Sequence, residues 1–231
     1  MSASGRSGRR ATSGRSTSRA LKTRAGTTAA VRADTAVGTR ERILAAAEML
    51  LRRHGVEKLT VVDVARTLGM SHANVYRHFA SRAALQDALV QGWLQQVTDP
   101  LREIVARPVP AGERLEAWLL ALITAKRRKV LRDPELFEAY HAAAEAARAV
   151  VDAYLREARQ QLARIVRDGV ASGEFAVRDV DAAVAAIYDA MGRFTDPHYI
   201  RRTANRSARA HEQDAKRVLA LVIAGLRAGV V

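Results

Sequence analysis

The sequence predicts an all-α protein of about nine helices, in which a small three-helix N-terminal domain precedes a larger helical bundle. Three observations support this fold class. Only 5% of the 231 residues are aromatic and five are Pro, whereas Ala, Leu, Arg and Glu, which favour helices, are abundant. Apolar residues recur at helical spacing along most of the chain. Short polar residues of the kind that cap helices precede several of these segments.

The composition also excludes several classes of protein. Because the chain has no Cys, disulfides, cysteine nucleophiles and thiolate metal sites are excluded. No apolar run approaches the roughly 20 residues needed to cross a membrane, and the N-terminus lacks the apolar core of a secretory signal. We therefore expect a cytoplasmic protein with no membrane partner.

Residues 1–38 are expected to form a disordered tail rich in Arg, Ser and Gly, because they include almost no large apolar side chain. The formal net charge of the chain is +14, and the tail carries eight Lys or Arg residues against a single acid, Asp34. This charge favours an anionic partner. Two interpretations stay open: the tail adds affinity for nucleic acid, or the start codon is assigned too far upstream.

The first predicted helix begins near Thr39, a candidate N-cap, and ends before Gly55. A second helix of about two turns begins after Thr60 and ends at Gly69. The apolar residues that define the first helix are Ile43, Leu44, Ala47, Leu50 and Leu51.

Ser71 is placed to cap a third helix and Ser81 to cap a fourth, longer one. Beyond Pro100 the apolar stripes lengthen, which predicts a helix bundle. We expect residues 39–84 and 85–231 to form the two domains. The stripes of the second domain cover residues 113–130, 135–171, 180–194 and 212–226.

Two short helices joined by residues 69–71, Gly-Met-Ser, are typical of a helix-turn-helix, whose second helix enters the major groove of DNA. The whole stretch of residues 59–85 closely resembles the DNA-binding signature of the TetR family. The resemblance is strong over residues 39–97, and the later helices match only in number, length and order. Arg82 stands where the family most often has Lys, and the long basic tail is not a general family feature. The matching residues are Gly55, Thr60, Ala65, Gly69, Ser71, Tyr76, His78, Phe79, Arg82 and Leu85.

The resemblance implies a homodimeric bacterial transcription regulator that acts at the nucleoid on a pseudo-palindromic double-stranded DNA operator. A repressor released by a small apolar or aromatic effector is the favoured form, and an activator is the alternative. No cofactor is implied.

The third helix is expected to turn an outer face towards the DNA bases, because Val75 and Phe79, four residues apart, can face the core. Alternatively, Tyr76 and His78 brace the motif as partly buried side chains, and Arg77 is a solvated surface charge. The candidates for base contact are His72, Ala73, Tyr76 and Arg77. The candidates for phosphate contact are Thr60, Asn74, His78 and Arg82, and Ser71, the predicted cap, completes the DNA-binding set.

The bundle offers candidates for an effector cavity and for a dimer interface, with ordinary core packing as the alternative for each residue. The candidates for ligand contact are Trp93, Trp118, Leu122, Tyr140, His141 and Tyr188. The candidates for the interface, on the last two long helices, are Ala182, Ala186, Ala190, Leu219, Val222 and Leu226.

Other functional classes find little support. The chain has no phosphate-cradling glycine loop, nucleophile elbow or zinc-hydrolase His pair, so we do not expect an enzyme. His141 and His198 lack a convincing metal-ligand arrangement, and we expect no metal. The basic run at residues 126–129 is interpreted as a solvated helix end. A DNA-packaging protein would explain the basic tail but would leave the large bundle without a role.

Overall fold

The computed structural model describes residues 38–230, so the predicted tail over residues 1–37 lies outside the described residues. Contacts divide the chain into two units, residues 1–43 and residues 44–231. In the first unit, residues 38–43 are described and are helical. Because residue 38 is already helical, Thr39 lies inside a helix, and the prediction that it is an N-cap is wrong.

The described part of the second unit is helical, with no strand, which confirms the all-α prediction. The predicted boundary at residue 84 lies within one continuous helix and stays a prediction. The first helix, which begins by residue 38, ends at residue 54. The elements that follow are η1 (Val56–Lys58), α2 (Val61–Leu68), α3 (His72–His78), α4 (Arg82–Val105), α5 (Ala111–Arg132), α6 (Pro134–Ala146), α7 (Arg148–Ala171), α8 (Val180–Met191), η2 (Gly192–Phe194), α9 (Pro197–Arg202) and α10 (Ala208–Ala228).

The short helices begin and end at the predicted capping residues. The hydroxyl of Thr60 accepts the backbone N–H of Asp63 at 3.1 Å, and the hydroxyl of Ser71 accepts the backbone N–H of Asn74 at 3.2 Å. Gly69 ends α2 with φ at 62°, a left-handed conformation that glycine adopts without a steric penalty. The turn between α2 and α3 is therefore encoded locally.

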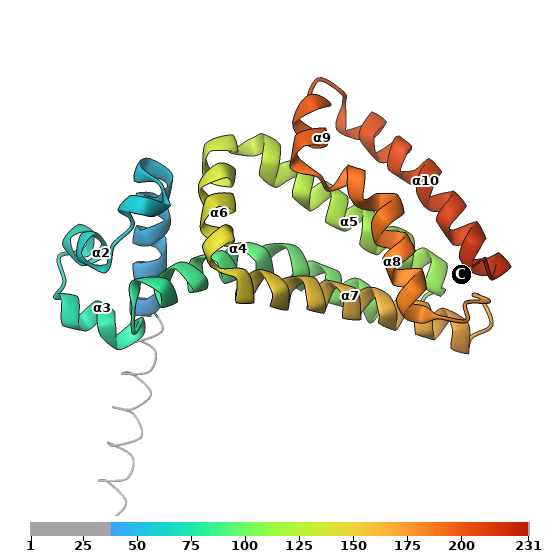
Figure 1. The fold of residues 1–231 in the computed structure, drawn as a ribbon, viewed down its shortest axis with the longest axis horizontal. Helices are drawn as coiled ribbons and strands as arrows, with labels where there is room; N and C mark the ends of the chain where they lie inside the picture. The colour runs from blue at the N-terminus through green and yellow to red at the C-terminus, as the bar shows by residue number, and fades with distance from the viewer. Residues whose placement is uncertain (1–37, 231) are drawn as a thin grey trace, which may run out of the picture. The chain divides into compact units, whose positions relative to one another are not determined.

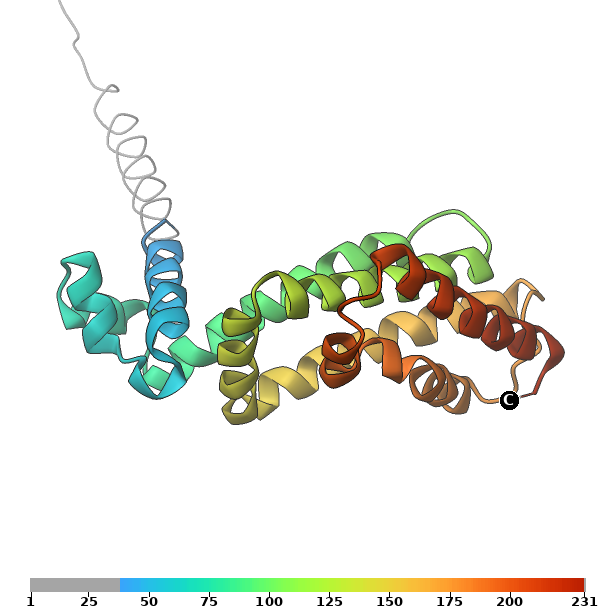
Figure 2. The same ribbon diagram turned by 90° about the horizontal axis from the view of Figure 1, so that it is seen from above.

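Three long helices, α4, α5 and α7, pack against one another and form the centre of the bundle, as both ribbon views show (Figures 1 and 2). Helix α8 packs on α7, and α10 packs on both α5 and α8. Their apolar stripes enclose one core, whose most buried members include Leu101, Leu115, Trp118, Leu162 and Ile187.

Helix α4 runs through Pro100 to Val105, with Pro100 exposed and Val97 and Leu101 packed in the core. One predicted helix limit differs from the structure. The stripe predicted over residues 135–171 is two helices, α6 and α7, separated at Ala147. The break turns α6 across the ends of its neighbours, and this placement forms one wall of the cavity described below.

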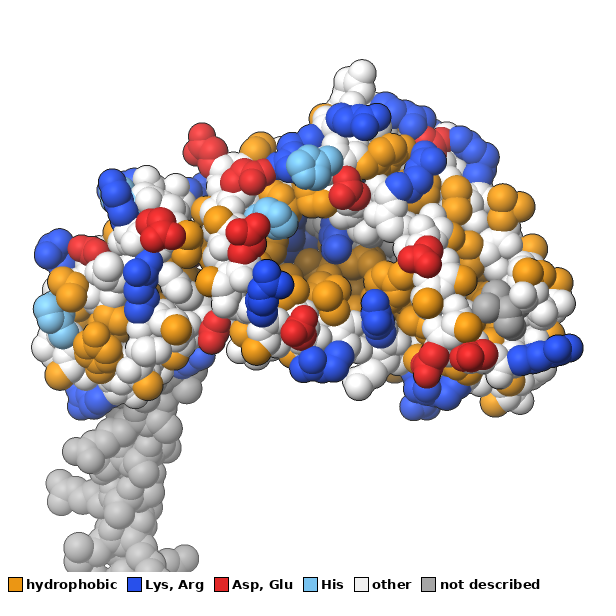
Figure 3. Space-filling model, in the orientation of Figure 1, with side chains coloured by type: hydrophobic (Ala, Val, Ile, Leu, Met, Phe, Trp, Pro, Cys, Tyr) orange, Lys and Arg blue, Asp and Glu red, His pale blue; other side chains and the backbone are white. Residues whose placement is uncertain are grey.

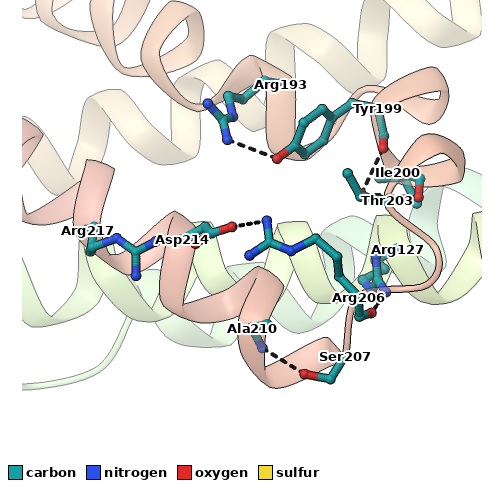
Figure 4. Close-up of polar contacts among 10 residues, drawn as sticks. All are labelled: Arg127, Arg193, Tyr199, Ile200, Thr203, Arg206, Ser207, Ala210, Asp214 and Arg217. Atoms are coloured by element: carbon teal, nitrogen blue, oxygen red, sulfur yellow. Dashed lines mark hydrogen bonds and ion pairs between the residues drawn. The ribbon is translucent and has the colours of Figure 1, made fainter.

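Polar contacts close the corner between α9 and α10 onto α5 (Figure 4). Asp214 accepts hydrogen bonds from the guanidinium groups of Arg206 and Arg217. Arg127 of α5 donates to the backbone carbonyl of Arg206 at 2.7 Å and is only 8% exposed. The interpretation of residues 126–129 as a solvated helix end is therefore wrong for Arg127, whose charge is held by a backbone acceptor inside the fold.

Candidate nucleic-acid interface and cavity

Helix α3 has one buried and one exposed face, as its spacing predicts. Val75 and Phe79 are 0% and 3% exposed and anchor the helix, whereas the ring of Tyr76 is 49% exposed. A single exposed helix face with Tyr and Arg side chains fits the dimensions and donor-acceptor pattern of the DNA major groove. The four base-contact candidates, His72, Ala73, Tyr76 and Arg77, are all exposed.

Asn74 holds the side chain of Arg77 in place on this face. The guanidinium Nη2 of Arg77 donates to Oδ1 of Asn74 at 2.7 Å. The side-chain nitrogen of Asn74 lies 3.8 Å from Sδ of Met70, in the turn between the helices. Asn74, predicted to contact phosphate, is thus already positioned to orient the arginine.

The other phosphate candidates differ in their surroundings. Thr60 donates its hydroxyl hydrogen to Asp63 Oδ2 at 2.6 Å, so the hydroxyl acts within the α2 cap. Arg82 donates through Nη2 to the backbone carbonyls of Val56, at 2.8 Å, and Glu57, at 2.9 Å. In the structure Arg82 therefore ties the start of α4 to η1, and its contact with phosphate stays a prediction. His78 is half-buried.

A cavity of about 410 Å³ is formed by α4, α5, α6 and α7 together with the chain around Pro197. Figure 3 shows a hollow in this face whose floor is largely hydrophobic, with Lys or Arg atoms inside it. Two of the six predicted ligand residues, Trp93 and His141, line the cavity. Other lining residues are Val97, Lys126, Lys129, Phe137, Tyr154 and Leu155.

Trp118 is a core residue and is not among the residues that line the cavity, so its contact with a ligand stays a prediction. It is 0% exposed, and its indole N–H donates to Oε1 of Gln161 at 2.8 Å. The ring is therefore packed inside the bundle and its polar atom has a hydrogen-bond partner. Leu122 and Tyr188 line a smaller neighbouring cavity of about 30 Å³.

Tyr140 lies behind the cavity wall and links α6 to the first helix. Its ring stacks on Trp93, with centroids 4.9 Å apart, and its hydroxyl donates to Oε2 of Glu48 at 2.8 Å. Burial and the Glu48 carboxylate raise the pKa of Tyr140, so the hydroxyl keeps its proton. Arg52 and Asp133 add an ion pair of 2.5 Å between the same two helices.

Two lysines of the run at residues 126–129 line the cavity, which the sequence interpretation missed. The ammonium of Lys129 lies 4.8 Å from the ring centroid of Trp93 and donates to Oε1 of Gln96 at 2.9 Å. Burial lowers the pKa of Lys129 to about 8 and also lowers the pKa of Lys126. The available signal was spacing, because Lys126 and Val130 continue the apolar stripe of Leu122 at intervals of four residues.

The predicted interface residues divide between the core and the surface. Leu219 and Leu226 are 1% and 2% exposed within a single chain and belong to its core, where α10 packs on α5 and α8, so they offer little surface to a partner and their place in an interface stays a prediction. Leu221, which was not predicted, is 75% exposed. Val222 and Ala190 are half-buried, and Ala182 and Ala186 are exposed.

Over residues 38–230, no helix is both long and apolar enough to cross a membrane. The same residues hold no cluster of three His, Asp or Glu side chains arranged to bind a metal ion.

Comparisons with known proteins agree with this architecture. The family model described as bacterial regulatory proteins of the tetR family matches residues 43–89, and the model described as a tetracyclin repressor-like C-terminal domain matches residues 111–219. A curated relative, the HTH-type transcriptional repressor KstR2 of Rhodococcus jostii, is 32% identical over 80 residues, which are 35% of this chain and 39% of KstR2. The chain thus spans less than half of the length of the curated relatives it matches first.

Solved structures extend the likeness to the whole fold. A protein of Pseudomonas aeruginosa PAO1 described as a transcriptional regulator has a TM-score of 0.65 and 21% identity, over 81% of this chain and 91% of that one. The regulator FadR of Bacillus subtilis, solved in complex with stearoyl-CoA, has a TM-score of 0.57 and 18% identity, over 80% of this chain and 98% of FadR. With matches to both the N-terminal and the C-terminal family models, the chain belongs to the TetR family, whose members are DNA-binding transcriptional regulators and not enzymes.

Proposed function

We propose that this chain is a homodimeric transcriptional repressor that binds a pseudo-palindromic DNA operator and is released by a small molecule in the cavity. One observation carries the proposal. Helix α6 contributes Phe137 and His141 to the cavity wall. Tyr140 of the same helix and Asp133, its N-cap, bond to the first helix of the DNA-binding head, by which we mean residues 39–84. A ligand that displaces α6 therefore acts directly on the head.

The DNA contacts follow from the exposed face of α3. Arg77, oriented by Asn74, is the residue for guanine, whose O6 and N7 accept two parallel hydrogen bonds. Tyr76 and His72 lie on the same exposed face. Arg82 sets the position of the head on the phosphates without reading sequence, whereas the Thr60 hydroxyl, whose hydrogen is donated to Asp63, positions α2.

The switch requires only that the ligand bind one conformation of the dimer better than the other. A coupling free energy of about 1–3 kcal/mol changes operator affinity by roughly 5–150-fold. The Bacillus subtilis FadR structure, which has the same fold, contains stearoyl-CoA, and this supports a ligand in the bundle.

A second copy of the chain is proposed to dock on the exposed faces of α8 and α10. Ala182 and Ala186 present small side chains on α8, and Leu221 presents a large apolar one on α10. Two heads related by a two-fold axis then read half-sites in neighbouring major grooves. The proposed place of action is the bacterial cytoplasm, at the nucleoid.

The test begins by selecting bound fragments from the source genome with the purified full chain. We expect a pseudo-palindrome, on which Arg77→Ala costs on the order of 1–3 kcal/mol while the preference at one base pair is lost. The matched control is Arg202→Ala, an exposed arginine on α9, which leaves the affinity unchanged. An equal loss of affinity for operator and random DNA in Arg77→Ala would contradict specific binding. If the chain raises expression from the downstream promoter in a reporter assay, it is an activator and the assignment as a repressor fails.

A further inference from the structure

We propose that the effector is an amphipathic anion, with an apolar body on the aromatic floor of the cavity and a carboxylate or phosphate head between Lys126 and Lys129. The inference rests on the proposed function for its regulatory meaning, but the site itself is argued from the charges and surfaces of the cavity.

The two lysines stand one turn apart on α5 and both line the cavity. Lys126 forms no hydrogen bond or ion pair with any residue of the range 38–230. Asp196, whose charge acts on Lys126, uses its carboxylate to cap α9 by accepting the backbone N–H of Tyr199 at 2.7 Å. Removing an ammonium from water without a counterion is unfavourable, and an anion in the cavity offsets this cost.

Lys129 is held in a position suited to the same anion. Its contacts with the Trp93 ring and the Gln96 amide place the ammonium at the cavity wall but supply no negative charge. Burial lowers its pKa to about 8, and the neighbouring charge of Arg128 acts in the same direction, while the carboxylate of Glu48, which is hydrogen-bonded to Tyr140, acts in the opposite direction and only partly offsets them. A bound anion between the two lysines favours the charged form of both.

The remaining charged groups of the cavity do not neutralise these lysines. Glu145 on α6 and Arg148 and Asp152 on α7 line the cavity but are exposed, and no ion pair joins them to either lysine. His141 on α6 is also exposed and stacks on the ring of Phe137. The mixed charges thus lie at the rim, and the unpaired positive charge lies deeper.

The apolar part of the cavity defines the rest of the ligand. Val97, Val130 and Phe137 are buried residues that line it, and Trp93, Tyr154 and Leu155 add apolar surface. A cavity of about 410 Å³ lies in the range of small-molecule sites and is large enough for a medium-length acyl chain or an aromatic acid.

The test compares ten-carbon probes that differ in the head group: decanoate, decyl phosphate, 1-decanol and decylammonium. Binding to the full chain is followed by tryptophan fluorescence, to which Trp93 of the cavity wall and the buried Trp118 contribute, and is checked by calorimetry. We expect at least one anion to bind about tenfold or more tightly than the alcohol and the amine, because charge-assisted hydrogen bonds are the stronger ones. The better of the two anions identifies the head group. Equal binding of all four probes, or binding of none, would overturn the proposal.

Three variants assign the head-group site. Lys126→Met and Lys129→Met remove the charge, keep the length of the side chain, and should each weaken the preferred anion about fivefold or more without weakening 1-decanol. Arg132→Met, an exposed arginine on the same helix that does not line the cavity, is the matched control and should bind as the wild type does. Circular dichroism confirms that each variant folds, and the probe series on the wild type remains decisive if one does not. Unchanged anion affinity in both lysine variants would contradict the site.

Operator affinity, measured with each probe, separates this inference from the proposed function. If an anion binds selectively but leaves operator affinity unchanged, the anion site stands and the effector mechanism fails. If 1-decanol and decanoate release the operator equally, the effector mechanism stands and the anion site fails.

Discussion

The hydroxyl of Tyr140 on α6 is bonded at 2.8 Å to the carboxylate of Glu48 on the first helix, while its ring is stacked on Trp93 of the cavity wall. One side chain therefore touches the cavity lining on one side and the DNA-binding head on the other. A ligand that shifts Trp93 or α6 changes this contact. In the proposed switch, the bond between Tyr140 and Glu48 therefore transmits a movement of the cavity wall to the first helix.

Tyr140→Phe removes the bond to Glu48 and keeps the stacked ring. We expect the free energy of unfolding to fall by about 1–2 kcal/mol, since the lost acceptor is a carboxylate. The change in operator affinity on adding effector should shrink severalfold. Chemical denaturation and operator titration with and without effector measure the two effects. Tyr199→Phe, which loses a hydrogen bond from Arg193 far from the head, is the control. If effector still lowers the operator affinity of Tyr140→Phe as much as that of the wild type, the bond to Glu48 plays no part in the switch.

Arg82→Ala should weaken operator and random DNA by the same factor and should also destabilise the fold by about 1 kcal/mol, because two backbone carbonyls of η1 lose their donor. Lys58→Ala is the matched control: it removes an exposed positive charge from the same turn, and no hydrogen bond of that side chain is involved. Thermal unfolding and filter binding distinguish the two roles. If both variants leave the stability of the fold unchanged, Arg82 contributes only its positive charge, and its hydrogen bonds to η1 do not stabilise the fold.

Leu221→Asp should convert the proposed dimer to a folded monomer, because the side chain is 75% exposed on the outer face of α10. Leu219→Asp, at 1% exposure, should instead unfold the chain at a cost above about 3 kcal/mol. Sedimentation and circular dichroism report the two outcomes. Val109→Asp, a 39% exposed apolar residue in the loop after α4, is the control and should remain a dimer. A dimeric Leu221→Asp variant would move the interface elsewhere.

Lys129→Met should stabilise the protein without effector at pH 7. Burial lowers the pKa of Lys129 from 10.5 to about 8, so the folded state binds fewer protons than the unfolded state between these values, and stability rises with pH across that window. Below pH 8 the full cost of the buried charge is present. The gain in the variant is on the order of 1 kcal/mol, less than the pKa shift alone implies, because solvent screens the half-buried ammonium.

Denaturation curves from pH 6 to pH 10 test this prediction. The variant should lose part of the rise in stability between pH 8 and pH 10, while Arg132→Met, which removes an exposed charge from the same helix, should keep it. A destabilised Lys129→Met variant would show that the contacts with Trp93 and Gln96 outweigh the cost of burial.

The sequence by itself determined the all-α class and the geometry of the helix-turn-helix. Thr60, Ser71 and Gly69 act on groups within three or four residues along the chain, so their roles do not depend on distant contacts. The alternation of buried Val75 and Phe79 with exposed Tyr76 likewise follows from helical spacing alone.

Only the tertiary structure decided which apolar and basic residues face a cavity, the core or the solvent. No Gly or Pro marks the break at Ala147, which makes α6 a separate helix with one side on the cavity and the other on Glu48. Lys126 and Arg127 are neighbours in sequence, yet one lines the cavity and the other donates to the carbonyl of Arg206, 79 residues away. In Ala-rich helices the apolar stripe is wide, and the helix that packs against it selects which part becomes buried.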